Sequence, residues 1–468
     1  MLTMTGHITP QDKAAGDYYY VPFDVPADVE RVDVRYAYSH PRHHGDFEGA
    51  GNTIDIGLFD PRGHEFMRGD GFRGWSGSDR QYVFVGEFES ASGYIRGPIA
   101  AGRWHVILGL YRVAEEGCEY QITVEFTPRR EGATAALRTM PDLRRVTSKG
   151  PSALENGLRW YRGDLQSHTH HSDGKGSLAT LIATARARGL DFLAVTDHNT
   201  ITHNLEFDEQ QPADLLLIPA EEVTTYYGHM NVWGVRDWVD FRARTANEMN
   251  RVVAAAHARG YLTSVNHPKP GGPAWEYGDE VDFDCIEVWQ APWPYHNTVS
   301  YEWWDALLRS GRRVIAVGGS DYHQPLEVMQ GNPHLLGQPT TWVCADELSA
   351  AAILNGIRQG RAFISGDVDG PRLFVSGVNA GGALLTGDVM AAGEPLDVTC
   401  RVQGAAGQTL RLVVDGAVAE AQRVEADDWT FTQRVRPRRY VRAEVAQAVP
   451  MFGHEQWLMS ALSNPIFV

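Results

Sequence analysis

The 468-residue chain has little cysteine, no long apolar run and no excess of positive charge. Its four cysteines lie far apart and form no Cys-x-x-Cys pair, which excludes a disulfide-stapled miniprotein and a zinc ribbon. No run of about 18 apolar residues occurs, so no transmembrane helix is expected. Acidic residues outnumber basic ones by 59 to 42, and the resulting net charge of -17 disfavours nucleic acid as a partner.

Two common catalytic motifs and a targeting signal are also missing. The chain has neither the Gly-x-Ser-x-Gly elbow of serine hydrolases nor the Gly-x-x-x-x-Gly-Lys-Ser/Thr loop of P-loop phosphotransferases. The N-terminal residues lack the basic start and apolar run of a signal peptide. We therefore expect a cytoplasmic protein with reduced, buried cysteines, and with neither a membrane nor a nucleic acid as partner. Its oligomeric state is left open.

Hydrophobic patterning divides the chain into three predicted domains. Residues 1–150 form an N-terminal β-sandwich plus a connector, because short apolar-polar alternations between residues 17 and 126 are separated by glycine, proline and aspartate clusters. In residues 151–369 strands alternate with helices, one of them opened by the capping box of Thr245 and Glu248. This alternation predicts parallel strands, in a barrel or an open sheet. Residues 370–468 return to strand-like alternation and predict a small C-terminal β-domain.

Histidines and carboxylates gather in the predicted α/β domain. Residues 168–334 contain 11 of the 18 histidines, and most of these directly follow a predicted strand. The groups at strand ends are His168, His170, His171 and Asp173; Asp197 and His198; Glu221 and Glu222; His267; and Asp321 and His323. Because the carboxyl ends of parallel strands build active sites, we expect these groups to converge. Such a cluster is costly without a divalent cation, although any single histidine could be a satisfied core residue.

The motifs that carry these groups form an ordered series. They are Gly163-Asp-Leu-Gln-Ser-His-Thr-His-His-Ser-Asp-Gly174, Val195-Thr-Asp-His-Asn199, Glu222-Val-Thr, Gly228-His-Met-Asn231, Asn266-His-Pro268 and Gly319-Ser-Asp-Tyr-His323. Over about residues 160 to 325 this series resembles the PHP (polymerase and histidinol phosphatase) superfamily, and most closely its carbaryl-hydrolase-like branch, CehA/McbA. The resemblance implies an α/β fold with a distorted (βα)7 barrel, here flanked by the two β-domains.

The resemblance also implies two to three divalent ions, zinc, manganese or iron, at the strand ends. By motif, a first ion is held by His168, Glu222 and Asp321, with Gln166 where the family has a further histidine. A second ion is held by Glu222 as bridge, His229 and His267. A third ion is held by Asp173, His198 and His323.

Two of these positions carry an open question. Gln166 departs from the family pattern, and an amide oxygen is a weaker ligand than imidazole for zinc-like ions. The first site is therefore expected to be weak, empty or suited to a harder ion, unless His170 or His171 completes it. Glu221 is an alternative bridge to Glu222, but strand alternation sends adjacent side chains to opposite faces, so only one of them should be a ligand.

Asp197 and Lys269 are the candidates for a role in catalysis. Asp197 could orient a metal-bound imidazole, or it could be a cap or turn carboxylate. Lys269 lies in a glycine- and proline-rich loop after His267. It could meet an anionic substrate, or it could be a solvated surface lysine.

The function that the resemblance implies is hydrolysis of a small-molecule substrate by a metal-activated water. We favour a phosphoesterase, with carbamate or carboxylic ester hydrolysis by the same metal site as the alternative. A third hypothesis is a binding module that has lost its activity through Gln166. It is disfavoured because a scaffold role gives no reason to keep so many ligand types together.

Overall fold

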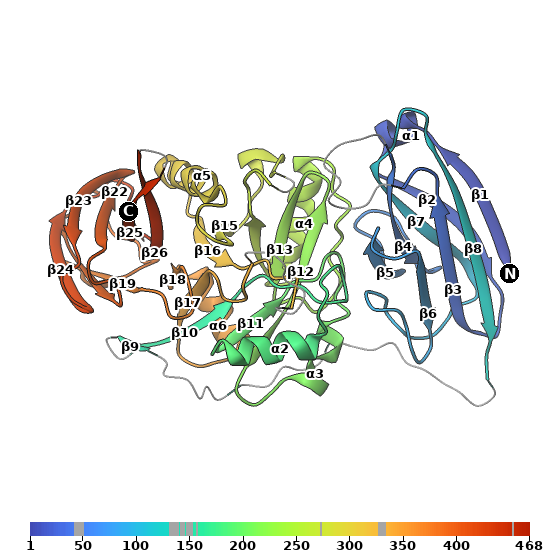
Figure 1. The fold of residues 1–468 in the computed structure, drawn as a ribbon, viewed down its shortest axis with the longest axis horizontal. Coiled ribbons are helices and arrows are strands. Elements are labelled where there is room, and N and C mark those ends of the chain that lie inside the picture. Colours follow the sequence, from blue (N-terminus) through green and yellow to red (C-terminus); the bar gives the residue numbers. More distant parts are fainter. Residues whose placement is uncertain are drawn as a thin grey trace.

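The computed structural model describes residues 1–41, 51–130, 140, 146, 153–155, 158–271, 274–325, 334–451 and 454–468. A β-rich region lies at each end of the molecule, and a mixed α/β region lies between them (Figure 1). Most of the predicted connector, residues 128–150, falls outside the described residues. Each helix in the described part is too short or too polar to cross a membrane.

The N-terminal region packs two four-stranded antiparallel sheets face to face, with strand orders β1-β8-β3-β6 and β2-β7-β4-β5. Its elements are β1 (Leu2–Ile8), α1 (Pro10–Ala15), β2 (Tyr18–Val25), β3 (Val29–Tyr38), β4 (Thr53–Phe59), β5 (Phe72–Gly77), β6 (Tyr82–Gly86), β7 (Gly102–Arg112) and β8 (Cys118–Pro128). Alternate residues of these strands, such as Val32, Val34 and Tyr36, are buried in one hydrophobic cluster. The strands predicted between residues 17 and 126 are confirmed, while the domain boundary at residue 150 stays a prediction.

The middle region alternates strands with helices over much of its length. Its elements are β9 (Ala153–Glu155), β10 (Leu158–Asp164), α2 (Leu178–Ala187), β11 (Phe192–Val195), α3 (Phe207–Gln210), β12 (Leu216–Thr225), β13 (Gly228–Trp233), α4 (Ala246–Ala258), β14 (Leu262–Asn266), β15 (Cys285–Gln290), α5 (Asn297–Ser310), β16 (Ile315–Gly319), β17 (Thr340–Ala345), α6 (Ala350–Arg358) and β18 (Ala362–Ser365). The helix starts follow the sequence signals, because Thr245 and Glu248 form the expected capping box on α4.

The strand directions depart from a strict strand–helix repeat. Strands β10, β11 and β12 pair in parallel, as do β14, β15 and β16. Strand β13 runs antiparallel to β12, because the turn between Thr225 and Gly228 is too short for a crossover helix, and it is also antiparallel to β14. Strand β17 is antiparallel to β10 and β18. The region is therefore a mixed α/β sheet, and its described residues do not show the expected (βα)7 barrel.

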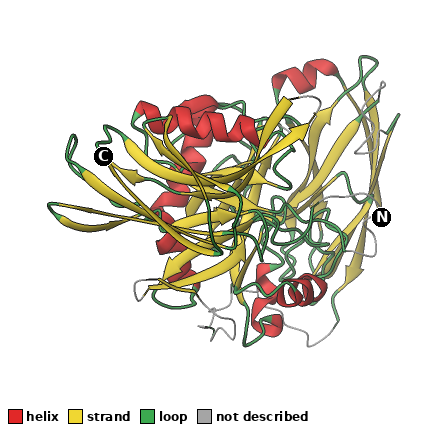
Figure 2. Cartoon of the chain, turned by 60° about the vertical axis from the view of Figure 1, so that its left-hand side comes forward, coloured by secondary structure: helices red, strands yellow, loops and turns green. Residues whose placement is uncertain are grey.

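The C-terminal region is built almost entirely of antiparallel strands, and Figure 2 shows how few helices accompany the strands of the chain. Its strands are β19 (Arg372–Asn379), β20 (Gly382–Leu385), β21 (Leu396–Gln403), β22 (Thr409–Val414), β23 (Ala417–Arg423), β24 (Asp428–Val435), β25 (Tyr440–Met451), β26 (His454–Ser463) and β27 (Ile466–Phe467). Strand β26 pairs with β18, so the sheet of the middle region continues into this part of the chain. All four cysteines are buried, as predicted.

Candidate metal centre

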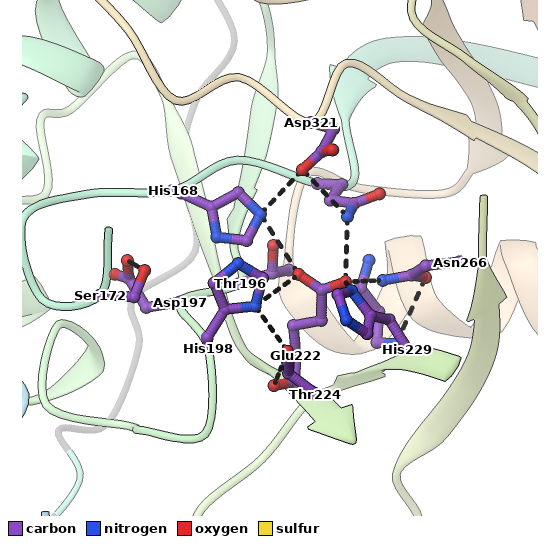
Figure 3. Close-up of polar contacts among 12 residues, drawn as sticks. His168, Ser172, Thr196, Asp197, His198, Glu222, Thr224, His229, Asn266 and Asp321 are labelled. Atoms are coloured by element: carbon purple, nitrogen blue, oxygen red, sulfur yellow. Dashed lines mark hydrogen bonds and ion pairs between the residues drawn. The ribbon is translucent and has the colours of Figure 1, made fainter. Parts of the chain in front are cut away.

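The carboxyl ends of the middle strands bring the predicted ligands to one place. Figure 3 shows five of them, His168, His198, Glu222, His229 and Asp321. The loop after β10 carries Gln166, His168 and Asp173, the loop after β11 carries His198, β12 carries Glu222, β13 carries His229, and the loops after β14 and β16 carry His267, Asp321 and His323. His229 belongs to this edge because β13 is antiparallel, which pairs its first residues with the ends of β12 and β14. The expected convergence is confirmed for His168, Asp173, His198, Glu222, His267, Asp321 and His323. Glu221 and His171, which were expected in the same group, face elsewhere.

Glu222 lies at the centre of the cluster and is fully buried. Its Oε2 is 3.3 Å from His168 Nε2 and 3.2 Å from His198 Nδ1. Its Oε1 is 3.2 Å from His229 Nδ1 and 3.5 Å from His267 Nε2. One carboxylate thus touches an imidazole from each of four separate segments.

Three overlapping sets of side chains have ligand atoms within 4.8 Å of one another and could each hold an ion. The inner set is His168, Glu222 and Asp321; the middle set is His198, Glu222 and His229; and the outer set is His168, Asp173, His198 and His323. The inner set matches the residues expected for the first ion. The middle set has His198 where His267 was expected, and the outer set adds His168 to the three expected ligands.

The two adjacent glutamates point in opposite directions. Glu221 Oε2 accepts a hydrogen bond of 2.9 Å from the backbone N–H of Val239, away from the histidines. Its burial raises the pKa of this carboxyl well above the usual value. Alternation along β12 therefore leaves Glu222 as the carboxylate that faces the cluster, and the alternative bridge Glu221 is wrong.

Gln166 reaches the cluster through its amide nitrogen. Nε2 donates hydrogen bonds of 3.2 Å to Glu222 Oε1 and to Asp321 Oδ1, while Oε1 is buried without a hydrogen-bond partner. Two carboxylate oxygens face the amide, so its N–H donors point toward them. The amide oxygen Oε1, which was expected to be a metal ligand, points away. His171 does not complete the site, since it contacts Thr202 Oγ1 at 2.8 Å and Glu206 Oε1 at 3.4 Å.

Exposure within the cluster rises steadily in one direction. The side chains of Glu222 and His168 are 0% exposed. Those of His198 and His323 are 19% and 21% exposed, and that of Asp173 is 49% exposed. The cluster is therefore closed at Glu222 and opens to solvent at Asp173, which is the side from which a substrate can approach.

Charge in the cluster is shared between carboxylates and imidazoles. Burial opposes ionisation of Glu222, but its contacts with His198, His229 and His267 hold its pKa well below the usual value. Burial also opposes protonation of His198, but Glu222 and Asp173 raise its pKa to about 9. Similarly, Asp173 and Asp321 raise the pKa of His323 to about 10. The carboxylates thus require positive charge, which protonated imidazoles or divalent ions can supply.

Several buried atoms of the cluster fit a divalent ion. Nδ1 of His168 is buried without a hydrogen-bond partner, and Nε2 of His168 faces Oε2 of Glu222 at 3.3 Å and Oδ1 of Asp321 at 3.0 Å. Unpaired polar atoms are costly in a protein interior, and nitrogen and carboxylate oxygen donors in close sets are those that transition-metal ions bind. The described residues therefore form a candidate site for divalent metal ions.

The backbone around the cluster is locally strained. His267, Asp321 and Asn199 have φ angles of 29°, 54° and 56°, in the left-handed region that residues other than glycine rarely adopt. Hydrogen bonds hold all three there: the N–H of His267 donates to Glu287 Oε2 at 2.9 Å, that of Asp321 to the Gln166 carbonyl at 3.1 Å, and that of Asn199 to the Glu222 carbonyl at 2.9 Å. Strain of this kind, concentrated at strand ends, is typical of functional sites.

Sequence reasoning missed three residues that support the ligands. Asn266 Nδ2 donates to Glu222 Oε1 at 2.9 Å, and Gln290 Nε2 donates to Asp321 Oδ2 at 3.0 Å. The third is Glu287, which holds the backbone of His267. Gln290 ends β15, so the rule that selected the histidines would also have selected it. Glu287 carries a different signal, a charged residue inside an otherwise apolar strand.

Asp197 is completely buried beside the cluster, and it binds the loop that carries two ligands. Its carboxylate accepts hydrogen bonds from the Thr169 backbone N–H at 2.8 Å, from Thr169 Oγ1 at 2.6 Å and from Ser172 Oγ at 2.6 Å. It also lies 3.1 Å from His203 Nδ1. In the described part of the chain, no hydrogen bond or ion pair joins this carboxylate to a predicted ligand (Figure 3). Its catalytic role stays a prediction.

Lys269 is buried, with 6% of its surface exposed, so the alternative of a solvated surface lysine is wrong. Its Nζ donates hydrogen bonds of 2.8 Å to the Gln290 carbonyl and to Asn297 Oδ1. Burial lowers the pKa of its ammonium group to about 8, although Glu287 and Asp321 act in the opposite direction. Gln290 also binds Asp321, so Lys269 is linked to the inner set through one intervening residue.

No family model and no curated protein matches the chain. Solved structures similar to it include a two-domain protein from Bacteroides vulgatus that contains a predicted PHP-like metal-dependent phosphoesterase. It has 16% sequence identity and a TM-score of 0.38, and the alignment covers 68% of this chain and 99% of that one. A protein from Bifidobacterium adolescentis described as a metal-dependent phosphoesterase has 17% identity, a TM-score of 0.27 and coverages of 42% and 94%.

An amidohydrolase from Chromobacterium violaceum, with bound sulfate and no metal, has 17% identity, a TM-score of 0.25 and coverages of 36% and 89%. At such low identities and TM-scores, these likenesses carry no argument about activity. The function of the chain must be inferred from the geometry of its own site.

Proposed function

We propose that the protein is a metal-dependent hydrolase that cleaves a phosphoester bond in a small molecule. The observation that carries the proposal is the shared carboxylate of Glu222, which has four imidazoles from different strands within 3.5 Å. A single carboxylate between several imidazoles is an arrangement that can bridge two ions in hydrolytic sites. The inner, middle and outer sets would hold two to three ions, zinc, manganese or iron.

The chemistry that divalent ions supply at such a site is an acidified water nucleophile and neutralisation of negative charge on the substrate. The remaining work falls to the chain itself. Glu222 and Asp321 fix the inner end of the site, and Gln166, Asn266 and Gln290 hold these carboxylates in place. The partly exposed Asp173 marks the open end, where the substrate would enter.

The buried ammonium group of Lys269 favours an anionic substrate. Its two hydrogen bonds to Gln290 and Asn297 fix the position of a cation that Gln290 separates from Asp321. A phosphate oxygen that binds near the inner set would find a positive charge there, whereas a neutral carbamate would gain less from it. Carbamate or carboxylic ester hydrolysis by the same metal site is the second candidate. It agrees with the CehA/McbA likeness of the motifs, which stays a prediction.

The proposal is tested by assaying metal-reconstituted protein on p-nitrophenyl phosphate, bis-p-nitrophenyl phosphate and 1-naphthyl N-methylcarbamate. Turnover of a phosphoester that chelation abolishes and added metal restores is the expected result. Metal-dependent turnover of the carbamate alone would replace the phosphoesterase with the second candidate. A protein that binds no metal after reconstitution with zinc, manganese and iron would contradict both.

Replacement of the shared carboxylate should remove metal and activity together. Glu222→Gln keeps the shape of the side chain but removes the charge between four imidazoles, so we expect loss of at least one bound ion and about a 100-fold or greater fall in kcat/KM. Elemental analysis by plasma mass spectrometry measures the ions. Glu221→Gln is the matched control one residue away, and its metal content should equal that of the wild type. Equal metal loss in both variants would contradict the assignment of Glu222.

A histidine at position 166 should strengthen the inner set. Gln166→His replaces an amide that donates to two carboxylates with an imidazole that can bind an ion. We expect the metal content to rise by up to about one equivalent, or the affinity of the weakest ion to increase by about tenfold. Competition with a chromophoric chelator measures this affinity. Unchanged metal binding would show that Gln166 does not limit the inner set.

Removal of the buried ammonium group should weaken phosphate turnover selectively. Lys269→Met keeps most of the aliphatic volume, and we expect kcat/KM for the phosphoester to fall by about 10- to 100-fold with unchanged metal content. Lys13→Met is the control, because it removes the same charge from α1, where Lys13 pairs with Asp17. Unchanged kcat/KM in Lys269→Met would refute a substrate-binding role for Lys269.

A further inference from the structure

The N-terminal sandwich touches the loop that supplies two of the candidate metal ligands. This ligand loop, residues 168–175, runs from His168 to Lys175. Arg80, in the turn between β5 and β6, donates hydrogen bonds from Nη2 to the carbonyl oxygens of His170 and of Ser172, the latter at 3.2 Å. Its Nη1 donates to the carbonyl of Ser92, within the sandwich. One guanidinium group therefore links the sandwich to the backbone of the ligand loop.

Other contacts at the same junction bring the two backbones close together. The carbonyl of Gly93 accepts a hydrogen bond of 3.2 Å from Thr200 Oγ1. A Cβ atom at Gly93 would lie only 2.7 Å from the carbonyl oxygen of His171, and its φ of 84° also favours glycine. In the same turn as Arg80, Asp79 forms an ion pair of 3.1 Å with Lys175, the last residue of the ligand loop. In Figure 1, β5 lies on the side of the sandwich nearer to the middle region.

The outer set depends on the position of this loop. Asp173 Oδ1 must meet His198 Nε2 at 3.5 Å and His323 Nε2 at 3.3 Å, although its side chain is half exposed. On the inner side, Asp197 holds the loop through Thr169 and Ser172. On the outer side, Arg80 holds the two carbonyls that precede Asp173 by one and by three residues. The loop is thus fixed between a carboxylate of the middle region and a guanidinium of the sandwich.

We propose that Arg80 is a positioning residue for the outer metal set, so that the N-terminal sandwich completes a metal centre whose ligands all come from the middle region. This inference rests on the metal centre proposed above. Arginine suits the role because its planar fork of five donors binds two loop carbonyls and Ser92 at once. A lysine could supply the charge but not the same set of directed hydrogen bonds.

The test compares Arg80→Ala and Arg80→Lys with Arg244→Ala, using cobalt as the probe. Arg244 is the matched control, because its Nη2 joins the middle region to the sandwich at the carbonyl of Ala14, away from the ligand loop. Titration with cobalt, followed by visible absorption, reports both the affinity of each ion and its ligand field. Hydrogen exchange of metal-free protein reports the order of residues 168–175 independently of any ion.

In Arg80→Ala the cobalt ion of the outer set should bind about 10- to 100-fold less tightly, the range seen when outer residues that orient ligands are removed. Amides of the ligand loop should exchange faster in this variant. The cobalt affinity and exchange rates of Arg80→Lys should lie between those of Arg80→Ala and the wild type, and those of Arg244→Ala should match the wild type. Wild-type cobalt affinity and spectrum in Arg80→Ala would overturn the inference while leaving the proposed function intact. Wild-type protein that binds no cobalt would instead overturn the metal centre itself.

Circular dichroism checks that each variant folds. If Arg80→Ala does not fold, the same titration of Arg80→Lys decides the question. Weaker binding of the outer ion by this variant would support the positioning role, and binding equal to that of the wild type would contradict it.

Discussion

The buried charge of Glu222 is the constraint on which the rest of the site depends. A carboxylate with no exposed surface is costly to ionise, and it is stable only where cations or donors surround it. Here four imidazoles and two amides face its two oxygens. Removing any one partner leaves the buried carboxylate with fewer donors or cations to compensate its charge, so the strand ends that carry these partners must lie together.

The fold provides this placement through strand directions. Parallel strands β10, β11 and β12 and parallel strands β14, β15 and β16 end at one edge, and the antiparallel β13 begins there. Left-handed backbone at His267 and Asp321 then turns these ligands toward Glu222. The solvent-exposed end at Asp173 is held from outside by the N-terminal sandwich, so regions distant in sequence meet at the open side of the site.

Much of this could be predicted from local sequence. Strand alternation predicted the sandwich strands and showed that only one of Glu221 and Glu222 can face the cluster. The position of the candidate ligands just after predicted strands placed them at one edge. Strand direction was harder to predict. The hairpin from β12 to β13 depends on a short turn that the sequence does not distinguish from other breaks between strands. The burial of Lys269, the donor role of Gln166 and the contact of Arg80 depend on residues far apart in the chain, which no local pattern encodes.

Anomalous X-ray diffraction from crystals of zinc-loaded protein would show whether Glu222 is shared between divalent ions. We expect at least two anomalous peaks, each about 2.0–2.2 Å from an oxygen of Glu222 and about 3.5–4 Å from each other. A further peak near Asp173, His198 and His323 would correspond to the outer set. Zinc that binds only elsewhere on the protein, with no peak within bonding distance of Glu222, would mean that Glu222 does not bridge ions.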